Sequence, residues 1–115
     1  MAVLAATHAN ITRCAERLRA GGIIAMPTET VYGLAADATN AAAVASIYAS
    51  KNRPKINPLI CHVGAPEEAF ELGVFNAHAR CLAERFWPGP LTLVVPRSAD
   101  CPVSKLASAG LPTLA

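Results

Sequence analysis

Apolar residues recur along this chain at two spacings, one typical of helices and one typical of buried strands. Over residues 11–18 they lie three or four positions apart, which predicts a helix with Asn10 as its N-cap. Residues 23–26 are all apolar and are followed by Pro27, which predicts a strand buried on both faces. A helix followed by a buried strand is the start of an α/β arrangement.

Helix caps and prolines divide the rest of the chain into further elements. Either Thr39 or Asn40 is predicted to cap a helix that extends through Lys51. The remaining predicted elements are a strand over residues 59–63, a short helix from Pro66, a helix from Asn76 to residue 86, a strand over residues 91–95, a loop over residues 96–110 and a strand from Leu111. We therefore predict an α/β fold, a twisted mixed parallel and antiparallel sheet flanked by helices, in a single domain over residues 1–115.

Composition and charge narrow the class of protein. The chain has 115 residues, of which 53% are hydrophobic and 16% are charged, so it is too apolar for a disordered protein. No apolar run reaches the ~18 residues of a membrane span, and residues 1–9 lack the basic start of a signal peptide, so we expect a cytoplasmic protein without membrane contact. The formal net charge of +2 is small and the basic residues are scattered, so any contact with RNA is expected to be local.

The four cysteines, Cys14, Cys61, Cys81 and Cys101, lie far apart and form no pair at metal-ligand spacing. They predict neither a zinc site nor a redox pair, and we expect reduced, half-buried thiols. Residues 110–115 form an apolar, strand-like run without the polar tail that usually closes a domain. The expected domain is therefore truncated at its C-terminus.

The turn after the first predicted strand, residues 27–33, is rich in polar groups. It presents the hydroxyls of Thr28 and Thr30 at a strand end, where α/β proteins gather their ligands. One interpretation is a binding site for a small polar molecule. The alternative is a structural turn in which both hydroxyls bond to nearby backbone and Glu29 faces water.

A second polar segment, residues 51–58, combines three cations and two amides at a helix end. Lys51 supplies a point charge and Arg53 a planar set of donors, which together suit the oxygens of a polyphosphate. The alternative is that both cations only complement the negative end of the helix. The chain has no Gly-x-x-x-x-Gly-Lys sequence, so a nucleotide would not be bound by a P-loop.

His62 lies inside the apolar strand predicted over residues 59–63. Alternation places it on the same face as Ile60 and on the opposite face from Cys61. A single histidine in a strand is more often a hydrogen-bonded core residue than a ligand. The nearby Asn57 and the cations before it favour the ligand interpretation here.

Two other residues are assigned to the fold rather than to chemistry. Trp87 follows a predicted helix and is expected to be a large core anchor. Asp37 is expected to serve a turn or a helix cap.

Four motifs, taken together, resemble the YrdC-like family. They are Pro-Thr-Glu-Thr-Val-Tyr-Gly-Leu at residues 27–34, Lys51-x-Arg53-Pro54, Asn57-Pro-Leu followed by His62, and Phe-Trp-Pro-Gly-Pro-Leu-Thr-Leu at residues 86–93. Each motif is weak alone, but all four occur in the order and spacing of the family. The resemblance covers nearly the whole chain.

The resemblance implies a fold and a reaction. The fold is a twisted mixed sheet with flanking helices and a large, positively charged cavity. The reaction joins L-threonine, bicarbonate and ATP into threonylcarbamoyl-AMP and pyrophosphate, and a downstream transfer machinery uses the product to modify tRNA. Magnesium accompanies ATP, and the family implies neither a tightly bound prosthetic group nor a metal site of the protein.

The resemblance also implies roles for individual residues. The expected contacts of ATP are Lys51, Arg53, Asn57 and Thr113, of which the first two are also the expected catalytic residues. The expected threonine-binding residues are Thr28, Thr30 and His62. Family members continue beyond residue 115 into segments that complete both substrate sites, so this chain alone is expected to turn over little or nothing.

Three alternatives stay open. One is a related domain of hydrogenase-maturation proteins that forms a carbamoyl-adenylate, although the absence of Cys-x-x-Cys pairs favours the free-standing synthase. Another is a non-catalytic module that binds double-stranded RNA by shape and phosphate contacts. The third is an α/β fragment without activity of its own.

Overall fold

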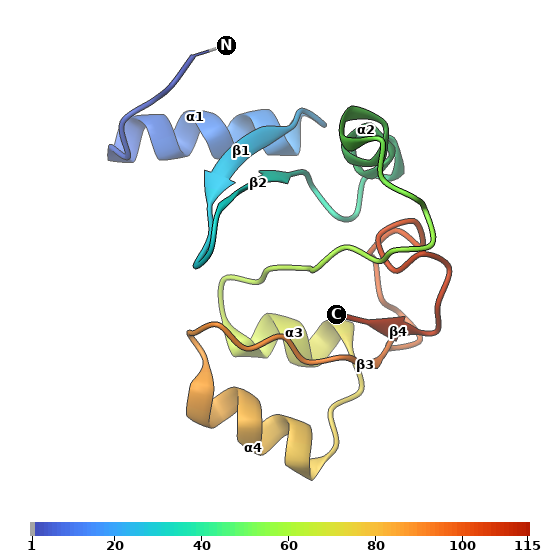
Figure 1. The fold of residues 1–115 in the computed structure, drawn as a ribbon. Coiled ribbons are helices and arrows are strands. Elements are labelled where there is room, and N and C mark those ends of the chain that lie inside the picture. The colour runs from blue at the N-terminus through green and yellow to red at the C-terminus, as the bar shows by residue number, and fades with distance from the viewer. Residues whose placement is uncertain (1) are drawn as a thin grey trace.

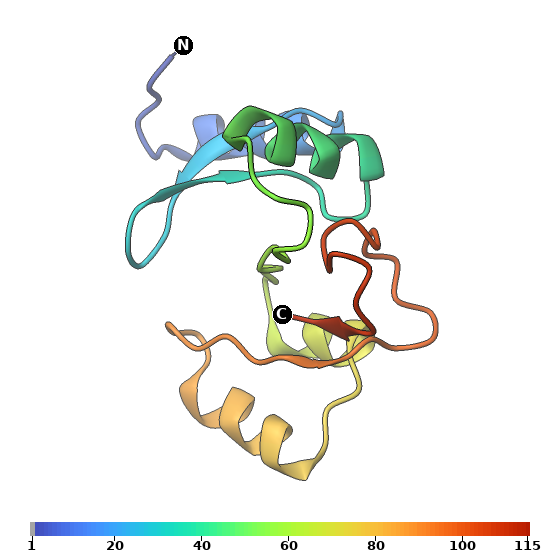
Figure 2. The same cartoon turned by 45° about the vertical axis from the view of Figure 1, so that its right-hand side comes forward.

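Helices and short strands alternate along the chain in the computed structural model, which describes residues 2–115. Met1, the first residue of the predicted domain, lies outside the described residues. The elements are α1 (His8–Arg19), β1 (Ile24–Pro27), β2 (Tyr32–Ala35), α2 (Ala41–Lys51), α3 (Pro66–Leu72), α4 (Ala77–Phe86), β3 (Val95–Pro96) and β4 (Thr113–Leu114). In Figures 1 and 2, α1, β1, β2 and α2 lie on one side of the molecule, and α3, α4, β3 and β4 lie on the other.

The strands form two antiparallel pairs. Ile24 of β1 lies opposite Ala35 of β2, and Val95 of β3 lies opposite Leu114 of β4. The α/β class, with helices beside short strands, is confirmed. Both pairs are antiparallel, so the parallel part of the predicted mixed sheet does not appear among residues 2–115.

The prediction of a strand buried on both faces is wrong for β1. Its residues alternate between half-buried and exposed. A strand is covered on both faces only where other layers pack on both sides of its sheet, and the apolar run itself cannot supply those layers. The strand predicted over residues 91–95 is also wrong, because only Val95 in that range belongs to a strand and only Val95 is buried.

The segment at residues 59–63 is extended but is not part of a regular strand pair, so this prediction is wrong as well. Its alternate amides bond to the C-terminal part of the chain: the N–H of Leu59 donates to the carbonyl of Ala107 at 2.8 Å, and that of Cys61 donates to the carbonyl of Ala115 at 2.9 Å. These bonds hold the segment across the middle of the molecule.

Side-chain caps begin three of the helices. Asn40 caps α2 by accepting the N–H of Ala43, and Asn76 caps α4 in the same way, as predicted. The prediction for α1 is wrong, because its N-cap is Thr7, whose hydroxyl accepts the N–H of Asn10 at 3.2 Å. Both residue types are good caps, so composition alone does not choose between them.

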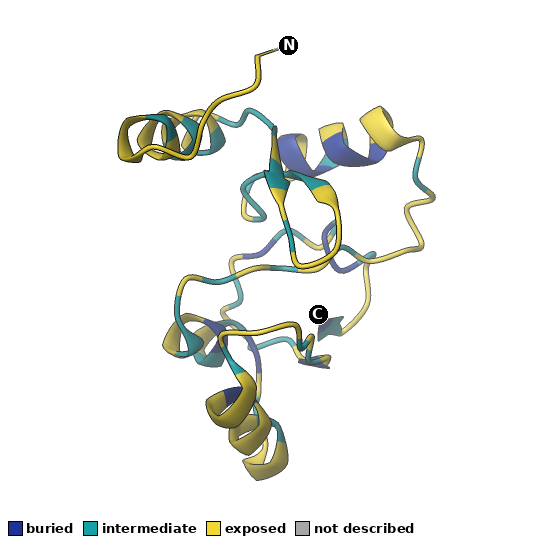
Figure 3. Cartoon of the chain, turned by 60° about the vertical axis from the view of Figure 1, so that its left-hand side comes forward, coloured by how far each residue is buried: buried dark blue, intermediate teal, exposed yellow. Residues whose placement is uncertain are grey.

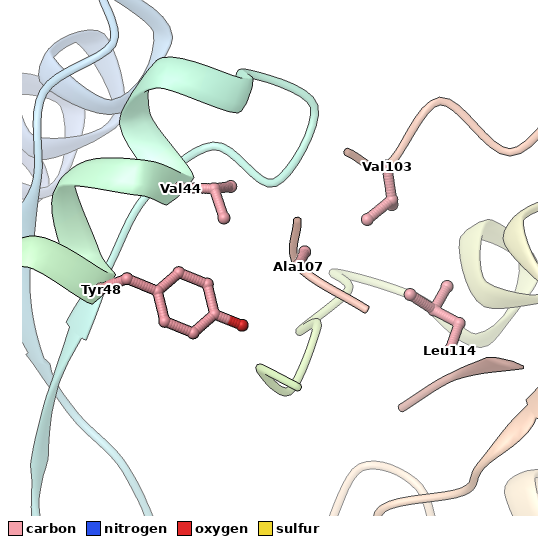
Figure 4. Close-up of a cluster of buried hydrophobic side chains, with 5 residues drawn as sticks. All are labelled: Val44, Tyr48, Val103, Ala107 and Leu114. Atoms are coloured by element: carbon pink, nitrogen blue, oxygen red, sulfur yellow. The ribbon is translucent and has the colours of Figure 1, made fainter. Parts of the chain in front are cut away.

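The core is built around α2. Figure 3 shows buried residues along one side of this helix, whereas α1 contains none. A cluster of five buried side chains joins α2 to the C-terminal segment (Figure 4), and its members are Val44, Tyr48, Val103, Ala107 and Leu114. The apolar stripe predicted for α1 is therefore at most half-buried, with Ile11 59% exposed.

Among residues 2–115, none of the helices combines the length and the apolar character needed to cross a membrane.

Candidate functional site

Two adjoining clefts lie between the β1–β2 hairpin and the other half of the molecule. The larger cleft has a volume of about 660 Å³, and its walls come from β1, β2, α2 and the extended segment at residues 58–63. Four residues predicted to bind substrates line it, and these are Thr28, Lys51, Arg53 and His62. Residues from three separate segments thus line one space.

The smaller cleft has a volume of about 440 Å³ and shares part of its wall with the larger one. Thr28 and His62 line both clefts. Its other walls include Glu29, residues 87–93 and the end of β4. The two clefts therefore meet at the hairpin turn and at His62.

The two cations at the end of α2 differ in exposure and in hydrogen bonding. Lys51 is exposed and extends from the last turn of the helix. Arg53 is half-buried and donates to two backbone carbonyls, from Nη2 to Pro58 at 3.0 Å and from Nε to Asn57 at 3.4 Å. Two of the Arg53 nitrogens therefore bond to the loop that carries Arg53. Lys51 is exposed, so its charge is the more accessible of the two to an anionic ligand.

The hydroxyl of Thr28 organises the hairpin turn. It accepts the N–H of Thr30 and the N–H of Val31, each at 3.3 Å, and donates to the carbonyl of Val31. The Thr28 and Thr30 hydroxyl oxygens are 3.4 Å apart. The structural interpretation of the turn is therefore confirmed for Thr28, which is half-buried, while Thr30 is exposed and lines neither cleft.

His62 is exposed, as is Ile60, while Cys61 between them is half-buried. The predicted alternation is confirmed even though the segment is not a regular strand. The interpretation of His62 as a hydrogen-bonded core residue is wrong, because His62 is exposed and lines both clefts.

Two predicted ATP contacts lie outside the walls of both clefts. Asn57 is exposed, and its backbone carbonyl rather than its side chain is engaged by neighbouring residues. Thr113 is half-buried in β4, where it pairs with Pro96 of β3. Four of the seven predicted site residues thus line one cleft, whereas Thr30, Asn57 and Thr113 line neither cleft.

Two titratable groups near the clefts have shifted pKa values. Hydrogen bonds from the hydroxyl and the N–H of Thr39, at 2.7 and 2.9 Å, lower the pKa of Asp37, which serves the turn before α2 as predicted. Burial raises the pKa of the Cys61 thiol, and the neighbouring Cys101 acts in the same direction. Cys14, Cys61 and Cys101 are half-buried free thiols, whereas Cys81 is exposed and departs from that expectation.

Trp87 forms a wall of the smaller cleft, a role that was not predicted from its motif. Its ring is half-buried rather than a buried core anchor, its Nε1 donates to the carbonyl of Leu91 at 2.7 Å, and it packs edge-on against Phe75 with centroids 6.2 Å apart. This position could have been expected from the residue type, because tryptophan has a polar N–H and favours half-exposed sites.

Among residues 2–115, no group of three or more His, Cys, Asp or Glu side chains is arranged to hold a metal ion.

Comparisons with known proteins show which family this chain resembles. A family model for Sua5, YciO and YrdC proteins, described as "Telomere recombination", matches residues 16–115. A threonylcarbamoyl-AMP synthase from Bacillus subtilis is 43% identical over 113 residues, which cover 97% of this chain and 32% of that protein. One from Pyrococcus abyssi is 46% identical over 99 residues, which cover 85% of this chain and 28% of that protein. The chain spans about a third of the length of these relatives.

Solved structures also resemble this fold closely. Pyrococcus abyssi Sua5 complexed with L-threonine superposes with a TM-score of 0.88 at 43% sequence identity, covering 94% of this chain and 32% of that one. A doubly substituted form of the same protein superposes with a TM-score of 0.89. The α/β arrangement described above is thus shared with a region of these larger structures.

Proposed function

The chain belongs to the Sua5/YciO/YrdC family, and we propose from this that the full-length gene product is a threonylcarbamoyl-AMP synthase that serves tRNA modification. The observation that carries the proposal is the larger cleft, where Lys51 and Arg53 share one space with Thr28 and His62. Cations suited to phosphate and polar groups suited to an amino acid thus line a common cavity.

The proposed reaction requires positioning and charge neutralisation more than covalent catalysis. Threonine reacts through its amine with bicarbonate to give a carbamate and water. A carbamate oxygen then attacks the α-phosphorus of ATP while the bond to the β-phosphate breaks and pyrophosphate leaves. Two anionic molecules must approach each other, and fixed cations lower the cost of that approach. Lys51 and Arg53 supply these charges, and no protein nucleophile is needed.

The substrate contacts are part of the same proposal. ATP, with its accompanying magnesium, would meet Lys51, Arg53, Asn57 and Thr113, and threonine would meet Thr28, Thr30 and His62. The cleft positions of Lys51, Arg53, Thr28 and His62 support the proposal, and the complex of Pyrococcus abyssi Sua5 with L-threonine supports threonine as a ligand of this family. Roles for Thr30, Asn57 and Thr113 rest on the family resemblance alone. We further propose a cytoplasmic protein with tRNA and a transfer enzyme as downstream partners.

The test is pyrophosphate release by the full-length protein with ATP, bicarbonate and each amino acid in turn. We expect release only with threonine, and a loss of about ten- to a hundredfold in kcat/KM for ATP in Lys51→Ala, because one charge-assisted contact to phosphate is removed. Lys105→Ala is the matched control. Both lysines are exposed, but only Lys51 lines the larger cleft, so Lys105→Ala should change kcat/KM by less than about twofold.

Two results would contradict the proposal. If the folded full-length protein releases no pyrophosphate with any amino acid, it is not this synthase. If it also binds double-stranded RNA with a steep salt dependence that ATP does not change, the RNA-binding alternative replaces the proposal. The 115-residue chain tested alone should bind both substrates poorly and turn over little.

A further inference from the structure

The loop between α2 and the extended segment, residues 52–58, carries part of the proposed nucleotide site. It is largely exposed, and few hydrogen bonds form within it. Ile56 is 81% exposed. The bonds within the loop are one from the N–H of Asn57 to the carbonyl of Pro54 at 3.1 Å and two from the Arg53 side chain to backbone carbonyls. An exposed loop with so few contacts is expected to be mobile unless other elements hold it. The orientation of Arg53 depends on this loop.

A buried tyrosine on the preceding helix holds the loop from inside. Tyr48 is only 2% exposed, and its ring packs in the core cluster with Val44 and Ala107 (Figure 4). Its hydroxyl lies 2.8 Å from the carbonyl oxygen of Asn57 and 3.1 Å from that of Leu106. A hydroxyl has one hydrogen to donate, and the shorter distance makes the Asn57 carbonyl its main acceptor.

The same carbonyl also accepts a hydrogen bond from Arg53. The guanidinium donates from Nε to Asn57 at 3.4 Å and from Nη2 to Pro58 at 3.0 Å. A carbonyl oxygen can accept two hydrogen bonds, so Tyr48 and Arg53 meet at one atom. Tyr48 thereby sets where the acceptor lies, and the acceptor helps to hold the guanidinium of Arg53, a residue that lines the larger cleft.

We propose that Tyr48 is a positioning residue for the nucleotide side of the site, and that it acts by fixing the Asn57 carbonyl against which Arg53 is aligned. The inference rests on the proposed synthase function. Packing alone does not require the hydroxyl, because a phenylalanine ring would fill the same space in the cluster. The hydroxyl is needed only for the carbonyls that it contacts.

The test is Tyr48→Phe in the full-length protein, with threonine-dependent pyrophosphate release as the assay. We expect the KM for ATP to rise about fivefold or more, while the KM for threonine stays within about twofold. Hydrogen exchange followed by mass spectrometry should show faster exchange in peptides covering residues 53–59 and unchanged exchange in α4. Exchange at the loop reports the hydrogen bond independently of catalysis.

Ser98→Ala is the matched control, because the Ser98 hydroxyl also donates to a backbone carbonyl, that of Glu71 at 2.8 Å, and contacts no part of residues 52–58. It should leave the KM for ATP unchanged. An equal rise in both KM values in Tyr48→Phe, or no change in either, would overturn the inference. Absence of release from the unsubstituted protein would instead overturn the proposed function on which the inference rests.

Discussion

At the residue scale, the chemistry of a side chain is visible in the sequence but its partners are not. Lys51 and Arg53 are both cations at one helix end, yet Arg53 is engaged with two carbonyls and Lys51 is exposed. Thr28 and Thr30 carry the same hydroxyl, yet Thr28 organises the turn and lines both clefts while Thr30 does neither. Each difference depends on backbone atoms that lie close only after folding.

Asp37 gives a prediction at this scale. Its pKa is lowered by the two bonds from Thr39, so the folded state holds the carboxylate more strongly than the unfolded chain does. This stabilisation is complete above the ordinary pKa of 3.8 and is lost as the pH falls through the lower, folded value. Asp37→Asn should therefore lower the free energy of unfolding at pH 7, and the difference from the unsubstituted protein should shrink toward pH 3.

Urea unfolding of the full-length protein between pH 3 and pH 7 measures this difference. Asp100→Asn, which removes an exposed aspartate outside this turn, serves as the control and should change the free energy of unfolding at pH 7 by less than about 0.5 kcal/mol. A deficit in Asp37→Asn that is equally large at pH 3 and pH 7 would show that the effect is not electrostatic.

At the element scale, helices are easier to predict than strands. The starts of α2, α3 and α4 follow from local signals, namely Asn40, Pro66 and Asn76. Strand pairing and burial require partners from distant parts of the chain, which is why residues 59–63 were predicted as a strand and are instead a single extended segment.

The cap of α2 gives a prediction at this scale. Asn40 accepts the N–H of Ala43 at 3.1 Å, and α2 contributes Val44 and Tyr48 to the core cluster. Asn40→Ala should lower the free energy of unfolding by about 1 kcal/mol, whereas Asn40→Gly should lower it by only a few tenths of a kcal/mol. Urea unfolding of both variants checks this difference. Equal losses in the two variants would indicate that the side chain does more than cap the helix.

At the scale of the whole molecule, stability depends on contacts between the two groups of elements. The core cluster in Figure 4 joins α2 to Leu114, which lies next to the last residue of the chain. Both clefts are lined by residues of the two groups, so the packing that stabilises the fold also sets the spacing of their walls.

Leu114 gives the prediction at this scale. It is 6% exposed, so Leu114→Ala should leave a cavity and lower the free energy of unfolding by about 2–5 kcal/mol. Leu111→Ala is the matched control, because Leu111 is 46% exposed three residues earlier and should cost less than about 1 kcal/mol. Chemical denaturation of the full-length variants compares the two. Similar losses would mean that the cluster does not join the two halves of the molecule.

Residue types and their spacing were enough to predict the α/β class, most helix starts, the cation cluster and the motifs of the family, because these features depend on neighbouring residues. The folded chain was needed to show that Thr28 and His62 share a cleft with Lys51, that Trp87 lines a wall, and that Tyr48 meets Arg53 at the carbonyl of Asn57. A cleft and a shared acceptor are formed by segments brought together through packing, and hydrophobic pattern along one segment carries no information about which other segment will cover it.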